Sequence, residues 1–237
     1  MALIELREAT VSVATPAGER VLLHPTTLSL PERRIAVIGP NGSGKSTLAR
    51  LLNALVVPTS GSVHVDGIDV AGQPAKARRA VGFCFTDPAA QLVMPTCVED
   101  IELSLRRHEK DAKSRRARAL DVLDAHGLRD HADLSVHTLS GGQKQLLALA
   151  GVLAVRPAVL VADEPTTLLD LAHTRRVGDL LFSLEQQLVL VTHDLSLARR
   201  CDRALVIDQA RVVFDGDAGA AVDHYVSSVA GEAPDER

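Results

Sequence analysis

The sequence lacks the features that would place it across a membrane, in an oxidising compartment or on nucleic acid. No apolar stretch reaches the roughly 18 residues that a membrane-spanning helix needs, and the N-terminus lacks the basic segment of a signal peptide. The 3 cysteines are scattered along the 237 residues, which favours reduced thiols over a disulfide framework or a metal site. The formal net charge of −4 gives no basic footprint, so we expect no nucleic acid as a partner.

Aromatic residues are also scarce. The chain has 4 Phe, 1 Tyr and no Trp, and the first of them is Phe83. The other proportions, 46% hydrophobic and 24% charged, are ordinary for a globular protein. The length suits one large domain, or a core with a subdomain.

One segment has the sequence pattern of a phosphate-binding loop. It follows an apolar run at 35–38 that predicts a buried strand, and it precedes residues 48–55, which have helical spacing. The pattern G-x-x-x-x-G-K-[ST] in this context offers backbone N–H groups and a helix N-terminus to phosphate. Lys45 can reach the β- and γ-phosphates, and the Ser46 hydroxyl can bind Mg²⁺. A glycine-rich turn without a ligand is the alternative. The predicted loop consists of Gly39, Pro40, Asn41, Gly42, Ser43, Gly44, Lys45, Ser46 and Thr47.

Short apolar runs that alternate with helical stretches predict an α/β fold, a P-loop NTPase core with a mostly parallel sheet and helices on its faces. β-rich segments within residues 3–30 indicate an antiparallel N-terminal β subdomain. From about 87 to 155 the pattern is helical, which indicates an inserted helical subdomain. We therefore expect one domain over residues 1–230, with its core at about 1–86 and 156–230, and a flexible tail at 231–237.

Two acids, Asp163 and Glu164, follow the apolar residues 159–162. A parallel strand buried on both faces has no use for paired carboxylates at its end unless something positive or reactive lies there. Asp163 would hold Mg²⁺, directly or through water, and Glu164 would polarise a water in line with the γ-phosphate. Alternatively, the two acids are solvated and cap a loop.

Residues 139–143 precede a long apolar helical stretch at 144–155. Ser140 is a good N-cap, and the glycines Gly141 and Gly142 let the backbone approach a ligand closely. This helix start suits an anion. A plain capped helix would leave both glycines unexplained. The histidines at 126, 131 and 137 lack the i, i+4 spacing of a helical metal pair and are expected at the surface.

Together these motifs resemble those of the ATP-binding cassette (ABC) family, in order and spacing, over essentially the whole chain. Residues 39–47 would be the Walker A loop, 139–143 the signature, and 168–170 the D-loop. In this family two nucleotide domains pack head to tail, with ATP between the Walker A loop of one and the signature of the other. The resemblance thus implies ATP hydrolysis, ATP and Mg²⁺ as cofactors, and a second ATPase subunit, giving a homodimer.

The resemblance also assigns roles to single residues. Lys45, Glu164 and His193 would be catalytic, with His193 sensing the γ-phosphate, although alone it would be a packed or capping histidine. Ser140, Gly141, Gly142 and Gln143 would contact the nucleotide across the interface. Ser46 and Asp163 would be metal ligands.

Two positions depart from the common family pattern. The aromatic residue that stacks on adenine is missing, and Thr15 stands at the aligned position, which predicts weaker or less base-selective nucleotide binding. Thr86 replaces the glutamine of the Q-loop. A threonine hydroxyl can still bind Mg²⁺, so Thr86 is a third candidate ligand. Gln91 either compensates or belongs to the surface that touches a membrane partner, which we favour.

The motif Asp-Pro-x-x-Gln at 87–91, followed by Pro-Thr-x-x-Glu-Asp at 95–100, is similar to the ATPases of energy-coupling-factor importers. Residues 32–38, 85–88 with 93–96, and 164–171 are most similar to the biotin-transport ATPases of that group. This implies a transmembrane coupling protein and a substrate-binding membrane protein as partners, at the cytoplasmic face of the membrane. An importer of cobalt, nickel or another vitamin, and a soluble cassette ATPase, stay open as alternatives. A P-loop kinase or GTPase is disfavoured by residues 139–143.

Overall fold

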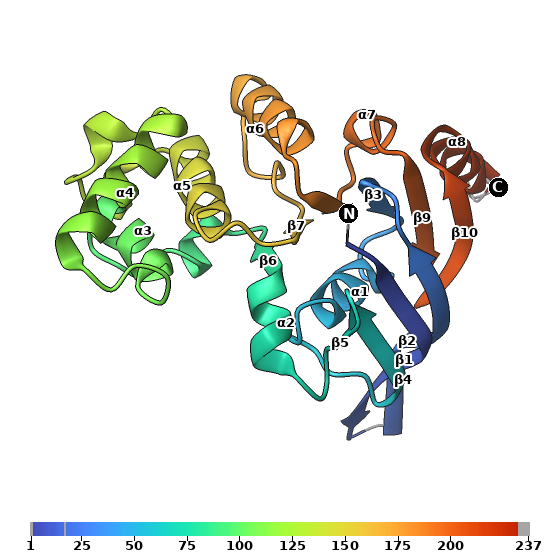
Figure 1. Cartoon of the computed structure of the whole chain (residues 1–237). Helices are drawn as coiled ribbons and strands as arrows, with labels where there is room; N and C mark the ends of the chain where they lie inside the picture. Colours follow the sequence, from blue (N-terminus) through green and yellow to red (C-terminus); the bar gives the residue numbers. More distant parts are fainter. Residues whose placement is uncertain (1, 17, 232–237) are drawn as a thin grey trace. The chain divides into compact units, whose positions relative to one another are not determined.

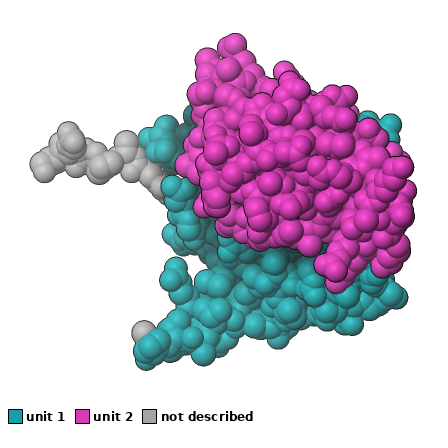
Figure 2. Space-filling model, turned by 90° about the vertical axis from the view of Figure 1, so that its left-hand side faces the viewer, with its two compact units in different colours: residues 1–81, 158–163, 185–237 teal, residues 82–157, 164–184 magenta. Residues whose placement is uncertain are grey.

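The structure is a computed structural model that describes residues 2–16 and 18–231 (Figure 1). The chain forms two compact units (Figure 2). Unit 1 comprises residues 1–81, 158–163 and 185–237, and unit 2 comprises residues 82–157 and 164–184. The expected core and insertion boundaries remain predictions about domain organisation. The expected tail lies, beyond Gly231, outside the described residues.

The first sheet of unit 1 is antiparallel, in the order β2-β1-β4-β5. Its strands are β1 (Ile4–Thr15), β2 (Gly18–Leu30), β4 (Ser60–Val65) and β5 (Ile68–Asp69). The short segments expected within residues 3–30 merge into two long strands, because register shifts between Leu6 and Ser12 absorb the irregular pattern. The turn between β4 and β5 has positive φ at Asp66 and Gly67, as a two-residue hairpin requires.

The second sheet positions the candidate site. Within unit 1 its order is β10-β9-β3-β8-β7. The central strand β3 pairs in parallel with β8 and β9, and β8 pairs in parallel with β7. Every residue of β3, β7 and β8 is buried, which explains why each is an apolar run. The predicted α/β fold with a mostly parallel sheet is confirmed. The strands are β3 (Arg34–Ile38), β7 (Val159–Asp163), β8 (Gln187–Val191), β9 (Arg203–Asp208) and the antiparallel β10 (Arg211–Asp217).

Helices of unit 1 cover this sheet. The helix α1 packs against β7 and β8, and α7 and α8 pack against β3. The helix expected at 48–55 starts three residues earlier, directly in the phosphate loop, and ends at Leu51. The helices are α1 (Lys45–Leu51), α2 (Pro74–Ala80), α7 (Leu195–Ala198) and α8 (Ala218–Gly231).

Unit 2 is mainly helical and begins within β6 (Val81–Cys84). Its helix α3 packs against α4 and α5, and α5 packs against α6. The helical region expected at about 87–155 contains α3, α4 and α5, and the stretch expected at 144–155 corresponds to α5, because each of these helices buries one face against its neighbours. The helices are α3 (Cys97–Leu105), α4 (Ala112–Ala125), α5 (Gly141–Leu153) and α6 (Leu171–Ser183), with the 3₁₀ turns η1 (Pro88–Ala90), η2 (Arg129–His131) and η3 (Val136–Thr138).

Candidate functional site

The predicted phosphate loop joins β3 to α1 and is held tightly on two sides. A Cβ atom on Gly39 would lie 2.0 Å from the carbonyl oxygen of Ile207, and one on Gly44 would lie 2.8 Å from that of Leu22. Both glycines have positive φ, +141° and +109°. The Ala210 amide also donates to the Ser43 carbonyl at 2.9 Å. Only glycine fits these two positions, so the pattern is required by the backbone path.

Lys45 lies within the loop rather than in solvent. Its side chain is buried, with the residue only 6% exposed, and Nζ donates to the carbonyl oxygens of Gly39 (2.8 Å) and Pro40 (2.7 Å). The ammonium therefore sits at the centre of the loop, beside the N-terminus of α1. Positive charge and backbone N–H groups at one place form a site suited to phosphate.

The structure brings the candidate metal ligands Ser46 and Asp163 together. Asp163 ends β7 and is 1% exposed. Its Oδ1 accepts a hydrogen bond of 3.0 Å from the Ser46 hydroxyl, and Arg50 lies 3.9 Å from Oδ2. A hydroxyl and a single carboxylate fit Mg²⁺, which commonly takes few protein ligands and completes its shell with phosphates and water. Among the described residues, no group of three or more His, Cys, Asp or Glu could hold a metal ion.

Strand register places His193 at the same edge of the sheet. Val191, the last residue of β8, pairs with Val37 of β3 on one side and with Asp163 of β7 on the other. The chain then leaves the sheet at Thr192, whose amide donates to the Val37 carbonyl at 3.2 Å. His193 follows and is exposed. His193 thus follows the end of β8, between the end of β3, which leads into the phosphate loop, and the end of β7, which carries Asp163.

Glu164 directly follows Asp163 but belongs to unit 2. Its φ is +53°, a left-handed conformation that costs a residue with a side chain roughly 1–2 kcal/mol. Its carboxylate accepts a hydrogen bond of 3.0 Å from the Thr167 hydroxyl. Strain of this kind at a charged residue motivates a functional hypothesis, and the same residue was singled out from sequence.

The predicted signature forms the start of α5. Ser140 is the N-cap and makes a capping box with Gln143: the Ser140 hydroxyl accepts from the Gln143 amide at 3.3 Å, and the Gln143 side chain accepts from the Ser140 amide at 2.9 Å. The expected N-cap is confirmed. The Gln143 side chain also lies 3.0 Å from the Nε2 atom of His131. His131 was expected at the surface, but its Nδ1 is buried and lacks a hydrogen-bond partner within the described residues.

His173, which no sequence pattern singled out, lies directly on the signature. A Cβ atom on Gly142 would be 2.0 Å from Cδ2 of the His173 ring. The ring is held by Asp170 of the predicted D-loop, whose carboxylate lies 2.9 Å from Nδ1. The available signal was weak: Asp170 and His173 have the i, i+3 spacing of a cap and its partner.

Thr86 lies in unit 2, where it lines a cavity together with the start of α5 and the predicted D-loop. The cavity includes Gly141, Lys144 and Leu168. Gln91 has a structural role: its side chain accepts from the Phe85 amide and donates to the Ala148 carbonyl, both at 3.2 Å. Gln91 therefore links the segment after β6 to α5, and these two hydrogen bonds use both the oxygen and the nitrogen of its side-chain amide.

The chain is similar in sequence to several known proteins. The family model for ABC transporters matches residues 23–167. A putative ABC transporter ATP-binding protein of Deinococcus radiodurans is 45% identical, over 94% of this chain and 97% of the relative. The biotin transport ATP-binding protein BioM of Rhizobium etli is 40% identical, over 90% and 95%. The energy-coupling factor transporter ATP-binding protein EcfA1 of Symbiobacterium thermophilum is 41% identical, over 77% and 66%.

A solved structure shows the same fold. The ATP-binding cassette MJ0796, in a dimeric post-hydrolysis state bound to ADP and Pi, superposes with a TM-score of 0.82 at 30% identity, covering 91% of this chain and 98% of that one. The fold and the phosphate loop define a nucleotide-binding P-loop ATPase. The chain belongs to the ABC transporter family, binds ATP and is an ATPase. Within the described residues, every helix is too short or too polar to span a bilayer.

Proposed function

We propose that this ATPase energises an importer of the energy-coupling-factor type whose cargo is biotin. The relatives named for biotin transport and for the energy-coupling factor support the proposal, as do the motifs at 87–91 and 95–100. Its partners would be a transmembrane coupling protein and a substrate-binding membrane protein, which would hold the ATPase at the cytoplasmic face of the membrane.

The observation that carries the chemistry is the contact between Ser46 and Asp163 beside the loop that encloses Lys45. Lys45 would exchange its two carbonyl partners for the β- and γ-phosphate oxygens. Ser46 and Asp163 would hold Mg²⁺, with Thr86 as a third oxygen; the ion would neutralise phosphate charge. Glu164 would orient and polarise the attacking water, and His193 would contact the γ-phosphate.

A second copy of the chain would complete the site. The phosphate loop belongs to unit 1, whereas Ser140, Gly141, Gly142 and Gln143 belong to unit 2. These four residues would meet the γ-phosphate that is bound to the loop of the other copy, at the N-terminus of α5. A homodimer would thus contain two nucleotide sites, in keeping with the dimeric state described for the cassette MJ0796.

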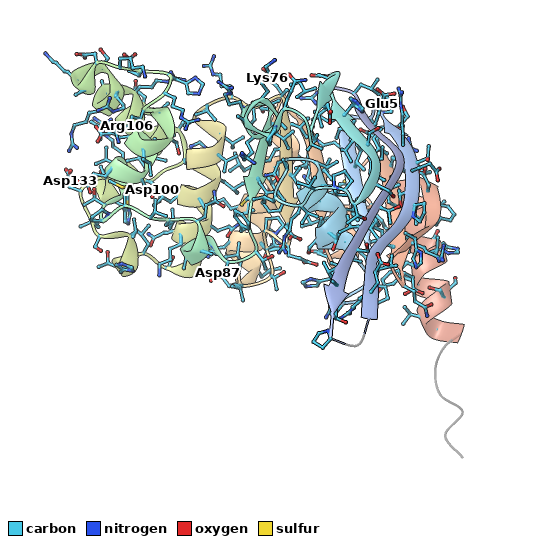
Figure 3. The ribbon with its side chains drawn as sticks, turned by 90° about the horizontal axis from the view of Figure 1, so that it is seen from below. Glu5, Lys76, Asp87, Asp100, Arg106 and Asp133 are labelled. Carbon is cyan, nitrogen blue, oxygen red and sulfur yellow. The ribbon has the colours of Figure 1, made fainter. Side chains whose placement is uncertain are left out.

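The segment 87–100 would contact the coupling protein. Val93 at its tip is a large apolar side chain that is 68% exposed, which would suit contact with an apolar surface of a partner. Asp100 fixes this tip: its Oδ1 accepts hydrogen bonds from the amides of Val93 (2.9 Å) and Met94 (3.0 Å). Figure 3 labels Asp87 and Asp100 in this segment, with Arg106 just beyond α3. The rigid tip could transmit motion of unit 2 to a partner.

The catalytic part is tested with Glu164→Gln. This variant should bind ATP and dimerise but hydrolyse ATP at least about 100-fold more slowly, because general-base catalysis typically contributes a factor of 10²–10⁴. Glu185→Gln, at an exposed glutamate, is the matched control and should keep the wild-type rate. Near-normal turnover by Glu164→Gln would remove Glu164 from the mechanism.

The cargo is tested by reconstitution. The ATPase is co-expressed with the membrane proteins encoded beside it, purified as a complex and placed in liposomes with internal ATP. Uptake of labelled biotin that is lost in Lys45→Ala supports the proposal. Uptake of cobalt or nickel without biotin would change the cargo, and failure to co-purify with any membrane protein would instead favour a soluble cassette ATPase.

A further inference from the structure

The cavity beside the phosphate loop extends from the loop to β2. It is lined by the start of α1 and by Arg20, Val21, Leu22 and Ala210. In a nucleoside triphosphate bound at Lys45, the ribose and base extend beyond the phosphates. Within the described residues no aromatic side chain lines this cavity, so the part of the nucleotide that carries the base must be recognised by other means.

The backbone of β2 is fixed against the loop. Gly44 approaches the Leu22 carbonyl so closely that a Cβ would lie 2.8 Å from it. The His24 amide donates to the Ala210 carbonyl at 2.8 Å, and the Ala210 amide donates to the Ser43 carbonyl at 2.9 Å. Arg20 is two residues before Leu22 and is paired with Val13 of β1. Its backbone position relative to the loop is therefore set by the first sheet.

The hairpin that carries Arg20 is closed next to it. Thr15 pairs with Gly18, and its hydroxyl donates to the Gly18 carbonyl at 2.7 Å. Thr15, which stands at the position of the missing adenine-stacking aromatic residue, thus stabilises the hairpin. Arg20 itself is exposed, and its guanidinium makes no hydrogen bond or ion pair among residues 2–16 and 18–231. The neighbouring acid, Glu19, accepts a hydrogen bond from Ser12 instead.

The Arg20 guanidinium has no acid partner among the described residues and lines the nucleotide cavity. It is planar, always charged and weakly hydrated, and it stacks on aromatic faces, including those of nucleobases. We propose that Arg20 is the nucleobase-contacting residue of this ATPase, and that its guanidinium stacks on the base of the nucleotide whose phosphates lie in residues 39–47. The proposal rests on the nucleotide site described above.

A stacked side chain contacts the π-face of a base and not its hydrogen-bonding edge, so stacking discriminates poorly between adenine and guanine. ATP and GTP should therefore bind Arg20 with similar strength, in agreement with the low base selectivity expected from sequence. A role of Arg20 in attracting phosphate charge would have a different signature, because it would act equally on a ligand that has no base.

The test compares ATP, GTP and inorganic tripolyphosphate by calorimetry at one salt concentration. Arg20→Ala should weaken ATP and GTP by about 5- to 20-fold, since base stacking and cation–π contacts have this size, and should change tripolyphosphate affinity by less than about twofold. Arg20→Trp should restore nucleotide affinity because it supplies a neutral stacking plane, whereas Arg20→Lys should not. Arg7→Ala, at an exposed arginine of β1, is the control and should match the wild type.

Equal weakening of tripolyphosphate and ATP by Arg20→Ala would overturn the proposal in favour of phosphate attraction. Unchanged ATP affinity in Arg20→Ala, or rescue by lysine but not by tryptophan, would also overturn it. Lys45→Ala separates the two proposals: loss of ATP binding in this variant with no effect of Arg20→Ala refutes only the role of Arg20. Unchanged ATP binding in Lys45→Ala would refute the nucleotide site itself.

Discussion

Gly142 of the signature gives the sharpest test of the packing in unit 2. The imidazole ring of His173 occupies the space that a side chain at residue 142 would need, with Cδ2 only 2.0 Å from the position of a Cβ atom. Gly141, its neighbour, is different: the nearest atom to a Cβ there is the Leu168 carbonyl oxygen, at 3.8 Å. Neither glycine has a positive φ in the left-handed region. The same methyl group should therefore destabilise the protein at Gly142 and have little effect at Gly141.

The magnitude for Gly142→Ala follows from the geometry. Carbon atoms in contact prefer about 3.5–4.0 Å, so the ring must move by more than an ångström. Overpacking typically costs about 1–3 kcal/mol, and displacement of the ring also disturbs its contact with Asp170 at the protein surface. The gain in helix propensity from alanine offsets less than 1 kcal/mol at this position. We expect a net loss of about 1–2 kcal/mol of unfolding free energy, or about 3–6 °C in Tm for a chain of this size.

The assay is thermal and urea unfolding of Gly142→Ala, Gly141→Ala, His173→Ala and the double variant Gly142→Ala/His173→Ala. Gly141→Ala should stay within about 0.5 kcal/mol of the wild type. The double variant should be more stable than Gly142→Ala alone, because removal of the ring opens the space, with a coupling energy of about 1–2 kcal/mol. Equal stability of the two alanine variants, or additive effects in the double variant, would refute the contact.

Three further changes test the structure. Asp100→Ala should lower the unfolding free energy by about 3 kcal/mol in urea titrations, because two amides lose a charged acceptor, whereas Asp100→Asn keeps an acceptor and should lose less; equal losses would contradict this. Gly39→Ala should lower the unfolding free energy by at least about 3 kcal/mol, since its methyl group would lie 2.0 Å from the Ile207 carbonyl oxygen. Gly42→Ala has open space around the added methyl group and should lower the unfolding free energy by only about 1 kcal/mol. Hydrogen bonds from the backbone amide and side chain of His173 lower the pKa of Asp170 below its ordinary value of 3.8, so the ionised Asp170 stabilises the protein above that pH and the stabilisation disappears as the pH falls below it. The urea midpoints of the wild type and of Asp170→Asn should therefore converge in that acidic range. A difference between the two midpoints that does not depend on pH would contradict the assignment.

The parts of the site that could be predicted from sequence are those in which a local pattern determines geometry. The glycine spacing of the loop left few possible backbone paths, and the apolar runs before Gly39, Asp163 and His193 predicted three buried strands. Parallel strands bring their carboxyl ends to one edge, so the contact of Ser46 with Asp163 followed from the fold class. The N-cap role of Ser140 likewise followed from local sequence.

The contacts that could not be predicted depend on packing between elements distant in sequence. His173 reaches Gly142 because α6 lies against α5, which no periodicity encodes. The structural role of Gln91 depends on the position of the Ala148 carbonyl, and the importance of Arg20 depends on how β2 passes the loop. Even the two N-terminal strands were divided wrongly into shorter ones, because the sequence pattern does not show that bulges allow a strand to continue.

The two signature glycines show that one sequence pattern can have two physical causes. Their presence was explained by close approach of a ligand, and for Gly141 nothing in the surrounding structure gives another reason. For Gly142 the His173 ring is a sufficient reason on its own. The double variant separates these causes: if Gly142→Ala/His173→Ala regains stability and also ATP hydrolysis, Gly142 is required only by the ring. If it regains stability but stays inactive while Gly141→Ala is inactive and stable, both glycines serve the ligand, and the ring is a second constraint on one of them.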